Sequence, residues 1–298
     1  MSSHLGTIIT AAVTPFDEHG HVDHDAFRVL LRHLVANGSD GVVVCGTTGE
    51  SPTLSDDEKC ELWRSAVDEV GGTATVIAGT GTYDTAHSVA LTRRACELGV
   101  DGVLVVTPYY SKPPREGLVR HFTHVAHAAG DVPVILYNIP GRSVINLEPD
   151  LVAELAQIAN VVGIKQANPD LTQLGEIRSL APDLTVWAGD DTSLLPMLAD
   201  GAVGGICVAS HVVGVQMRQV VDLWQSGDES AAAELSATLD DVYETLAVAP
   251  NPIAVKAALN QLGISVGGLR LPLVEATGMQ VERIRAMLQR HELETARA

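Results

Sequence analysis

The stretch VVGIKQA (161–167) is a short run of Val and Ile that ends in a lysine. Similar apolar runs recur along the chain, without the polar–apolar alternation of a half-exposed strand. Continuous apolar runs are typical of parallel strands that are buried on both faces. Together with this one, the eight runs are TIITAAV (7–13), GVVVCG (41–46), TVIAGTG (75–81), GVLVVTP (102–108), PVILYNIP (133–140), LTVWAGDD (184–191) and GGICVAS (204–210).

Helical stretches separate these runs. HDAFRVLLRHLVANG (24–38) is amphipathic and closes on a glycine, as helix C-termini often do. SDDE (55–58) has the S-x-x-E form of a capping box, which predicts a helix start after the second run. Eight strand–helix units predict an α/β fold, a (β/α)8 TIM barrel over residues 1–225 that forms the catalytic domain. A doubly wound open sheet is the alternative, but no GxGxxG follows the first run, and the even spacing favours closure.

The last part of the chain has a different pattern. It contains helical stretches with no strand between them: SAAAELSATLDDVYETLAV (230–248), PIAVKAALNQLG (252–263) and VERIRAMLQRHELE (281–294). No low-complexity tract or Gly/Ser linker separates this part from the rest. We therefore predict a C-terminal helical domain, residues 226–298, that packs beside the barrel.

The composition excludes several classes of protein. The net charge is −18, from 19 basic and 37 acidic side chains, which repels nucleic acid. No stretch approaches the roughly 18 consecutive apolar residues of a membrane span, and the first residues do not resemble a signal peptide. The cysteines (Cys45, Cys60, Cys96 and Cys207) form no CxxC pair. We therefore expect a cytoplasmic protein with reduced thiols, no nucleic-acid partner and no membrane contact.

Lys165 is the only one of the four lysines that ends a strand-like run. Barrel enzymes place their reacting groups at the C-terminal ends of strands. One interpretation is a lysine whose head group reaches past the strand to water. The other, which we favour, is an amine nucleophile. Desolvation at the barrel mouth disfavours the ammonium form, and a neutral amine can attack a carbonyl to form a Schiff base that acts as an electron sink.

Schiff-base chemistry requires groups that move protons, and hydroxyls stand at the neighbouring strand ends. Thr47 follows the second run, Tyr110 follows the fourth, and Tyr137 lies in the fifth, whereas His211 is the only histidine at the predicted mouth. A single tyrosine in such a place is more often packing than catalysis. Two tyrosines and a threonine around a strand-end lysine can instead relay protons in a chain.

GTTGES (46–51) and Arg142 indicate binding of carboxylates. The motif lacks the GK[ST] ending of a P-loop, and its simplest interpretation is a turn that feeds the next helix. Its Thr47 and Thr48 also expose N–H groups and hydroxyls, which can hold a small carboxylate. The guanidinium of Arg142, in YNIPGRS, offers a bidentate fork for a second one. The set suggests a keto acid joined to another anionic substrate, and no His/Asp/Glu cluster has metal-ligand spacing.

The chain resembles the dihydrodipicolinate synthase / N-acetylneuraminate lyase family of class I, pyruvate-dependent aldolases. The similarity runs from TIITAAVTPF to GLRLPL (268–273). The motifs that carry it are GTTGES (46–51), VTPYYSKPPREG (106–117), YNIPGR (137–142), GIK (163–165), GDD (189–191) and NPIAVKAAL (251–259). The resemblance implies a homotetrameric TIM barrel, a dimer of dimers, with a helical C-terminal part.

The resemblance also implies roles for the matching residues. Lys165 would form the imine with pyruvate and no cofactor would be needed, while Tyr137 would be the general acid and base above the imine. Thr47 would connect Tyr137 to Tyr110, and Tyr110 would reach in from the neighbouring subunit. The region around Thr48 would bind the pyruvate carboxylate.

The second substrate that the resemblance implies is L-aspartate 4-semialdehyde. Arg142 would bind its carboxylate, and Gly189 and Ile206 would add backbone contacts. The arginine in YNIPGR fits the synthases, although Gln166 stands where these usually carry an acidic residue. The product would be 4-hydroxy-tetrahydrodipicolinate, on the diaminopimelate route to lysine. The alternatives are a catabolic aldolase that acts on a sugar-derived 2-keto acid, and a catalytically silent keto-acid-binding barrel.

Feedback inhibition by lysine is not expected to be strong. Members of the family that lysine inhibits carry histidines just after GTTGES, and an Asn and a Glu beyond the third strand. The matching positions hold Asp56, Lys59, Tyr83 and His87. A like charge at Lys59 and the missing carboxylate disfavour an effector that carries two ammonium groups.

Overall fold

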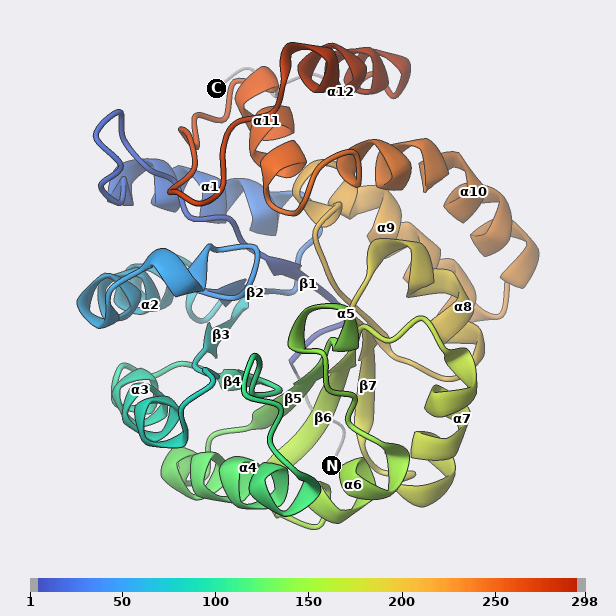
Figure 1. Ribbon diagram of the computed structural model, residues 1–298. Coiled ribbons are helices and arrows are strands. Elements are labelled where there is room, and N and C mark those ends of the chain that lie inside the picture. The colour runs from blue at the N-terminus through green and yellow to red at the C-terminus, as the bar shows by residue number, and fades with distance from the viewer. Residues whose placement is uncertain (1–4, 294–298) are drawn as a thin grey trace.

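The computed structural model describes residues 5–293, and its strands close into one parallel barrel. The strands follow one another around the barrel in chain order, and the first pairs with the last (Figure 1). This confirms the predicted TIM barrel. The strands are β1 (Ile8–Ala11), β2 (Gly41–Val44), β3 (Thr75–Gly79), β4 (Gly102–Val106), β5 (Val134–Asn138), β6 (Val161–Gln166), β7 (Thr185–Ala188) and β8 (Gly204–Cys207).

Each predicted run contains one strand and extends past its C-terminal end. The run 204–210, for example, holds β8 and then continues into a helix that begins at Ser210. Apolar residues continue beyond the last ladder hydrogen bond because the loops that leave the barrel are themselves partly buried. Sequence periodicity therefore locates the strands but not their ends.

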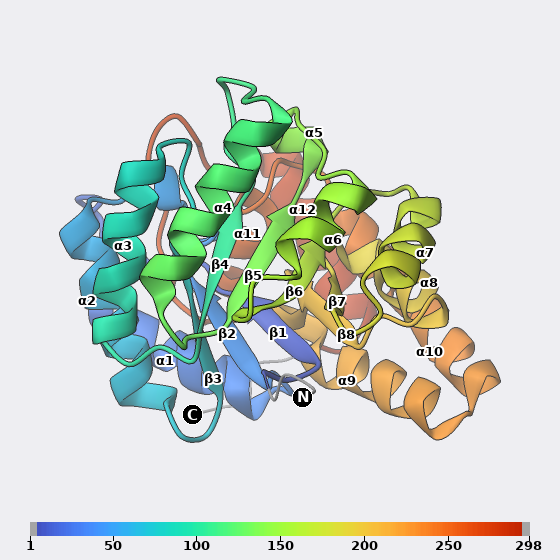
Figure 2. The ribbon, with the colours of Figure 1, turned by 90° about the horizontal axis from the view of Figure 1, so that it is seen from below.

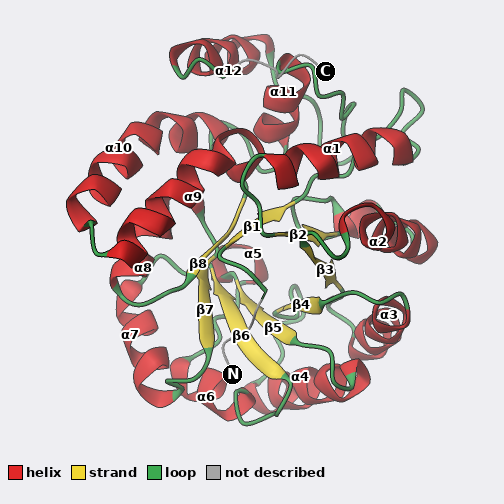
Figure 3. Cartoon of the chain, turned by 180° about the vertical axis from the view of Figure 1, so that it is seen from behind, coloured by secondary structure: helices red, strands yellow, loops and turns green. Residues whose placement is uncertain are grey.

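Helices surround the barrel as an outer ring, which Figure 3 shows from the opposite side. The predicted capping box is confirmed, since Ser55 and Glu58 exchange side-chain and backbone hydrogen bonds at the start of the second helix. The helices of the ring are α1 (His24–Ala36), α2 (Asp56–Val70), α3 (Thr85–Glu97), α4 (Arg115–Ala129), α6 (Pro149–Leu155), α7 (Leu171–Leu180), α8 (Leu194–Ala199) and α9 (Ser210–Ser226). Short turns at the mouth are η1 (Ser51–Thr53), α5 (Pro140–Ser143) and η2 (Asp191–Ser193).

Up to residue 293, the C-terminal part contains helices and no strand, as predicted. They are α10 (Glu229–Leu246), α11 (Ile253–Gln261) and α12 (Gly278–Arg290). Helix α10 packs on α9, and α11 packs on both α12 and α9. In Figure 1 these helices lie outside the ring, next to α1 and α9. The predicted domain boundary at residues 225 and 226 falls on the last residues of α9.

Large side chains fill the interior of the barrel below its mouth. Trp187 is fully buried there, and its Nε1 donates a hydrogen bond to the Gly6 carbonyl at 2.9 Å. The glycine of GIK makes room for this ring, since a Cβ on Gly163 would lie 2.5 Å from it. The interior is thus a packed core, and chemistry is expected at the C-terminal ends of the strands.

All four cysteines are free, and Cys45, Cys60 and Cys207 are buried. Between residues 5 and 293 no helix has both the length and the apolar character needed to cross a bilayer.

Candidate active site

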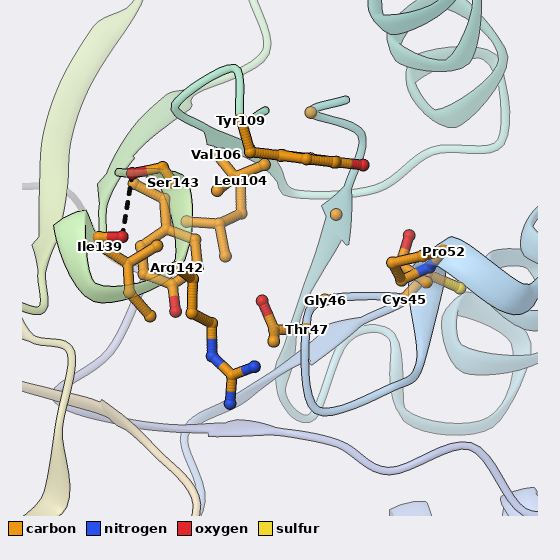
Figure 4. Close-up of a pocket in the computed structure, with 14 residues that line it drawn as sticks. Cys45, Gly46, Thr47, Pro52, Leu104, Val106, Tyr109, Ile139, Arg142 and Ser143 are labelled. Carbon is orange, nitrogen blue, oxygen red and sulfur yellow. Dashed lines mark hydrogen bonds between the residues drawn. The ribbon is translucent and has the colours of Figure 1, made fainter. Parts of the chain in front are cut away.

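Two adjoining pockets open at the C-terminal end of the barrel. The lysine pocket, of about 260 Å³, is named for Lys165 and is also lined by Thr48, Gly189, η2 and the residues that follow α10. The apolar pocket, of about 200 Å³, is lined by Leu104, Val106, Tyr109 and Pro52, among others (Figure 4). The side chains that line both pockets are Thr47, Tyr137, Ile139 and Arg142. Residues predicted from separate strands therefore converge at one place.

Lys165 and Tyr137 lie side by side on adjacent strands. Their Cα atoms are partners in the β5–β6 ladder, and the Lys165 Nζ lies 4.4 Å from the centre of the Tyr137 ring. Only 5% of Lys165 and 4% of Tyr137 is exposed. Among residues 5–293, no carboxylate lies close enough to Lys165 to form an ion pair. The amine is therefore desolvated and faces a π system instead of a counter-ion.

Gln166 turns away from the pocket. Successive side chains of a strand point to opposite faces, so Lys165 points into the barrel and Gln166 points outward to the helices. There the Gln166 Oε1 accepts a hydrogen bond from the Asn138 Nδ2 at 2.9 Å, and Asn138 also donates to the Asn146 Oδ1 at 2.8 Å. Gln166 lines neither pocket. The unusual residue after the lysine thus lies outside the pockets.

The loop after β2 brings both threonines to the site. Thr47 lines both pockets, and Thr48 is 2% exposed at the wall of the lysine pocket. The Thr48 Oγ1 accepts a hydrogen bond from the Asn251 Nδ2 at 2.9 Å, which leaves the hydroxyl proton free to be donated. The sequence analysis missed Asn251 as a site residue, although NPIAVKAAL contains it. Only the fold shows that this asparagine reaches the barrel mouth.

Arg142 projects from α5, which stands at the open end of the barrel in Figure 2. Pro140 begins this turn, and the Ser143 Oγ donates to the Ile139 carbonyl at 2.9 Å and to the Ile145 carbonyl at 2.8 Å. In Figure 4 the Arg142 guanidinium extends toward Thr47, and Arg142 lines both pockets. A cation held on a short braced turn can meet an anion that enters either pocket.

Tyr110 does not reach the site within one chain. Its side chain is 89% exposed, its φ of +73° is in the left-handed region, and it lines neither pocket. The residue before it, Tyr109, lines the apolar pocket and packs edge-on against Tyr83 at 5.5 Å between ring centres. Burial, and to a lesser degree the nearby Tyr83 hydroxyl, raises the pKa of Tyr109. Tyr109 belongs to the VTPYYSKPPREG motif, but the sequence analysis assigned it no role.

Gly189 and Ile206 occupy different surroundings. Gly189 lines the lysine pocket, and its N–H donates to the Gln166 carbonyl at 2.7 Å, so its own carbonyl is the group left for a ligand. Ile206 is fully buried in the barrel interior and lines neither pocket. The structure thus brings Gly189, but not the Ile206 side chain, to the pocket wall.

Asp191 is a wall residue of the lysine pocket that the sequence analysis did not single out. Its Oδ1 accepts the backbone N–H groups of Val208 at 2.9 Å and Ala209 at 3.0 Å, which fixes the turn after β8. Burial raises the pKa of Asp191 to about 6, and these two N–H donors oppose that rise. The two hydrogen bonds thus hold the Asp191 carboxylate in place, although burial removes it from water.

His211 is not available as an acid or base. It is fully buried, and one ring nitrogen accepts the Val13 N–H at 3.2 Å while the other donates to the Val208 carbonyl at 2.8 Å. Burial lowers the pKa of His211 to about 4, so the ring is neutral at pH 7. His211 also lines neither pocket.

Comparison with known proteins agrees with this geometry. The model of the dihydrodipicolinate synthetase family matches residues 4–291. A 4-hydroxy-tetrahydrodipicolinate synthase from Desulforudis audaxviator is 49% identical over 98% of this chain and 100% of its own.

Two solved structures match in fold as well as in sequence. Dihydrodipicolinate synthase from Cyanidioschyzon merolae with lysine bound is 40% identical, with a TM-score of 0.95 over 97% of this chain and 99% of its own. The chloride-inhibited enzyme from Acinetobacter baumannii complexed with pyruvate is 34% identical, with a TM-score of 0.94 over 97% and 99% of the two chains.

Proposed function

The chain belongs to the dihydrodipicolinate synthetase family, and from that premise we propose that Lys165 binds pyruvate covalently as an imine. The enzyme is a pyruvate-dependent aldolase of lysine and diaminopimelate synthesis. It condenses pyruvate with L-aspartate 4-semialdehyde to 4-hydroxy-tetrahydrodipicolinate. The relatives that match over nearly the whole chain are synthases, which favours this activity over a sugar-acid aldolase or a silent barrel.

The environment of Lys165 is the single observation that carries the proposed mechanism. Its Nζ is buried, faces a tyrosine ring and lines a pocket that also holds two threonines and an arginine. The Nζ attacks the keto carbon of pyruvate, and loss of one water leaves a C=N bond. Loss of a methyl proton gives an enamine, whose carbon attacks the aldehyde of the second substrate. The amino group of that substrate then displaces Nζ and closes the ring, and no cofactor takes part.

Tyr137 is the residue best placed to move protons. Its ring covers Nζ, and its side chain lines both pockets next to Thr47. We assign it the general acid and base for loss of water and for enamine formation. Thr47 is assigned the next proton transfer, between Tyr137 and Tyr110.

The two anionic ends of the substrates have separate binding groups. The Thr48 hydroxyl, oriented by Asn251, donates to the carboxylate of pyruvate. The guanidinium of Arg142 binds the carboxylate of the aldehyde substrate as a bidentate fork. The Gly189 carbonyl and the backbone at Ile206 contribute the remaining contacts to the imine.

Tyr110 completes the site from a second copy of the chain in this proposal. It is exposed on a left-handed turn at the barrel mouth, beside the half-buried Tyr109. A homotetramer, built as a dimer of dimers, places the Tyr110 of one subunit against the Thr47 of another. A cytoplasmic location is proposed as well, because the buried cysteines are free thiols.

Deuterium exchange tests the imine and enamine steps without the second substrate. In D2O, the enzyme should replace the methyl protons of pyruvate with deuterium, as followed by proton NMR. Lys165→Ala should abolish this exchange, and Tyr137→Phe should slow it strongly. Equal exchange rates with the wild type and with Lys165→Ala, after subtraction of the rate without enzyme, would refute the proposal.

Subunit mixing tests the shared site. Lys165→Ala and Tyr110→Phe should each be nearly inactive. When the two variants are unfolded together and refolded, some sites pair an intact Lys165 with an intact Tyr110, and activity should reappear. If mixing restores nothing while the mixed oligomers form, Tyr110 does not act across subunits.

A further inference from the structure

Three residues of the C-terminal part hold the loop that carries Thr47 and Thr48. They come from the segment between α10 and α12 and contact four residues that lie more than 200 positions away in the sequence. The contacts are Asn251 to Thr48, Lys256 to Glu50, and Arg270 to Glu50, Thr53 and Glu58. The helical extension therefore reaches the loop at several points.

Glu50 is the centre of this contact and has an unusual backbone. Its φ of +55° lies in the left-handed region, which residues other than glycine rarely adopt. Its side chain is fully buried, with the Oε1 atom 3.1 Å from the Lys256 Nζ and the Oε2 atom 3.0 Å from the Arg270 backbone N. The conformation of Glu50 is thus fixed by groups outside its own loop.

Lys256 also contacts the loop indirectly, through Thr14. It is 1% exposed, and its Nζ donates to the Thr14 carbonyl at 2.9 Å and lies 4.4 Å from the centre of the Phe16 ring. The Thr14 Oγ1 in turn donates to the Gly49 carbonyl at 2.7 Å. Lys256 therefore holds Glu50 directly and Gly49 through Thr14.

From this geometry we propose that Lys256 and Glu50 are positioning residues, which set the loop so that Thr48 meets the carboxylate of pyruvate. Glu50 lies two positions after Thr48 in the loop. The turn η1, which starts at Ser51, has no side-chain cap of its own. A buried ion pair adds little stability compared with an apolar pair of similar size, but it defines one geometry. The inference rests on the proposed function of the site.

The test separates positioning from stability. Lys256→Met and Glu50→Gln should each lower the Tm, because each leaves one buried charge without its partner. The double variant carries neither charge and should recover much of the Tm. The pyruvate concentration for half-maximal borohydride trapping on Lys165 should rise about tenfold in all three variants. Lys256→Arg keeps a cation, so its half-maximal pyruvate concentration should lie between those of the wild type and Lys256→Met.

A control comes from the ion pair between Arg290 and Asp241, which joins α12 to α10 and lines neither pocket of the site. Arg290→Gln should leave pyruvate trapping unchanged. A half-maximal concentration that stays at the wild-type value in Lys256→Met, or that returns to it together with the Tm in the double variant, would overturn the inference. A wild-type enzyme that traps no pyruvate on Lys165 would instead overturn the proposed function, and this inference with it.

Discussion

Two lysines of this chain are buried over aromatic rings at the same distance and have opposite surroundings. Lys165 lies 4.4 Å from the centre of the Tyr137 ring, and Lys256 lies 4.4 Å from that of Phe16. Lys256 also has the Glu50 carboxylate and the Thr14 carbonyl as partners. Lys165 instead lines a pocket large enough for a small substrate.

In the proposed mechanism, this difference separates a structural lysine from a reactive one. Burial lowers the pKa of Lys256, although the Glu50 carboxylate opposes the shift. The Lys256 Nζ is engaged by two oxygen atoms and lines neither pocket of the site. Lys165 lines the lysine pocket, where a substrate carbonyl can reach its Nζ.

The largest expected effect is that of removing the unpartnered amine. Lys165→Ala should lower kcat/KM by about a thousandfold or more, because no other group can form the imine. The fold should persist, since Lys165 forms no ion pair within residues 5–293. Steady-state assays with pyruvate and aspartate semialdehyde, together with circular dichroism, check both parts. Retained turnover in a folded variant would remove the distinction between the two lysines.

The next effect concerns the cation that faces the same pocket. Arg142→Ala should raise the KM for aspartate semialdehyde about a hundredfold, because it removes a charged bidentate contact worth about 2–3 kcal/mol. Pyruvate exchange in D2O should change little. Arg142→Lys keeps the charge but loses the bidentate fork, so its KM should lie between those of the wild type and Arg142→Ala. An unaltered KM would indicate that the second substrate carries no anion at this position.

A smaller effect concerns the carboxylate in the wall of the lysine pocket. Because burial raises the pKa of Asp191 to about 6, the charged form is disfavoured in the folded state. The contribution of Asp191 to the free energy of unfolding should therefore fall by about 1–2 kcal/mol between about pH 4 and pH 6, after allowance for partial exposure.

Asp191→Asn isolates this contribution. The amide oxygen can still accept both backbone N–H groups, which bind the same Oδ1 in the wild type. In urea unfolding at several pH values, the free energy of unfolding of the variant should rise relative to that of the wild type from pH 4 to pH 6. A difference that does not depend on pH would show that Asp191 has an ordinary pKa.

The smallest effect concerns a third buried lysine. Lys59 is 4% exposed, and the nearby Asp56 carboxylate is already bound by the His87 Nε2 at 2.8 Å. Free L-lysine therefore meets a like charge and no free carboxylate at these positions, and at 1 mM it should inhibit by less than about twofold. A titration of activity with lysine, at saturating and sub-saturating pyruvate, measures this. Half-inhibition below 1 mM would contradict the assignment.

Much of the fold could be predicted because eight buried parallel strands leave a strong apolar signal. Lys165 could be predicted as well, since a cation that ends such a strand is rare. The surroundings of Lys256 could not, because its partner Glu50 is 206 positions away and its helix appears unremarkable in sequence. The same holds for Asn251, whose contact with Thr48 spans 203 positions. Contacts between distant segments leave no local pattern.

Borohydride trapping tests the difference between the lysines most directly. The wild-type enzyme is reduced with borohydride in the presence of pyruvate, digested, and analysed by peptide mass spectrometry. One reduced pyruvate adduct should appear on the peptide that contains Lys165, and none on the peptides that contain Lys256 or Lys59. An adduct on Lys256, or an unmodified Lys165 under conditions of full activity, would contradict the account.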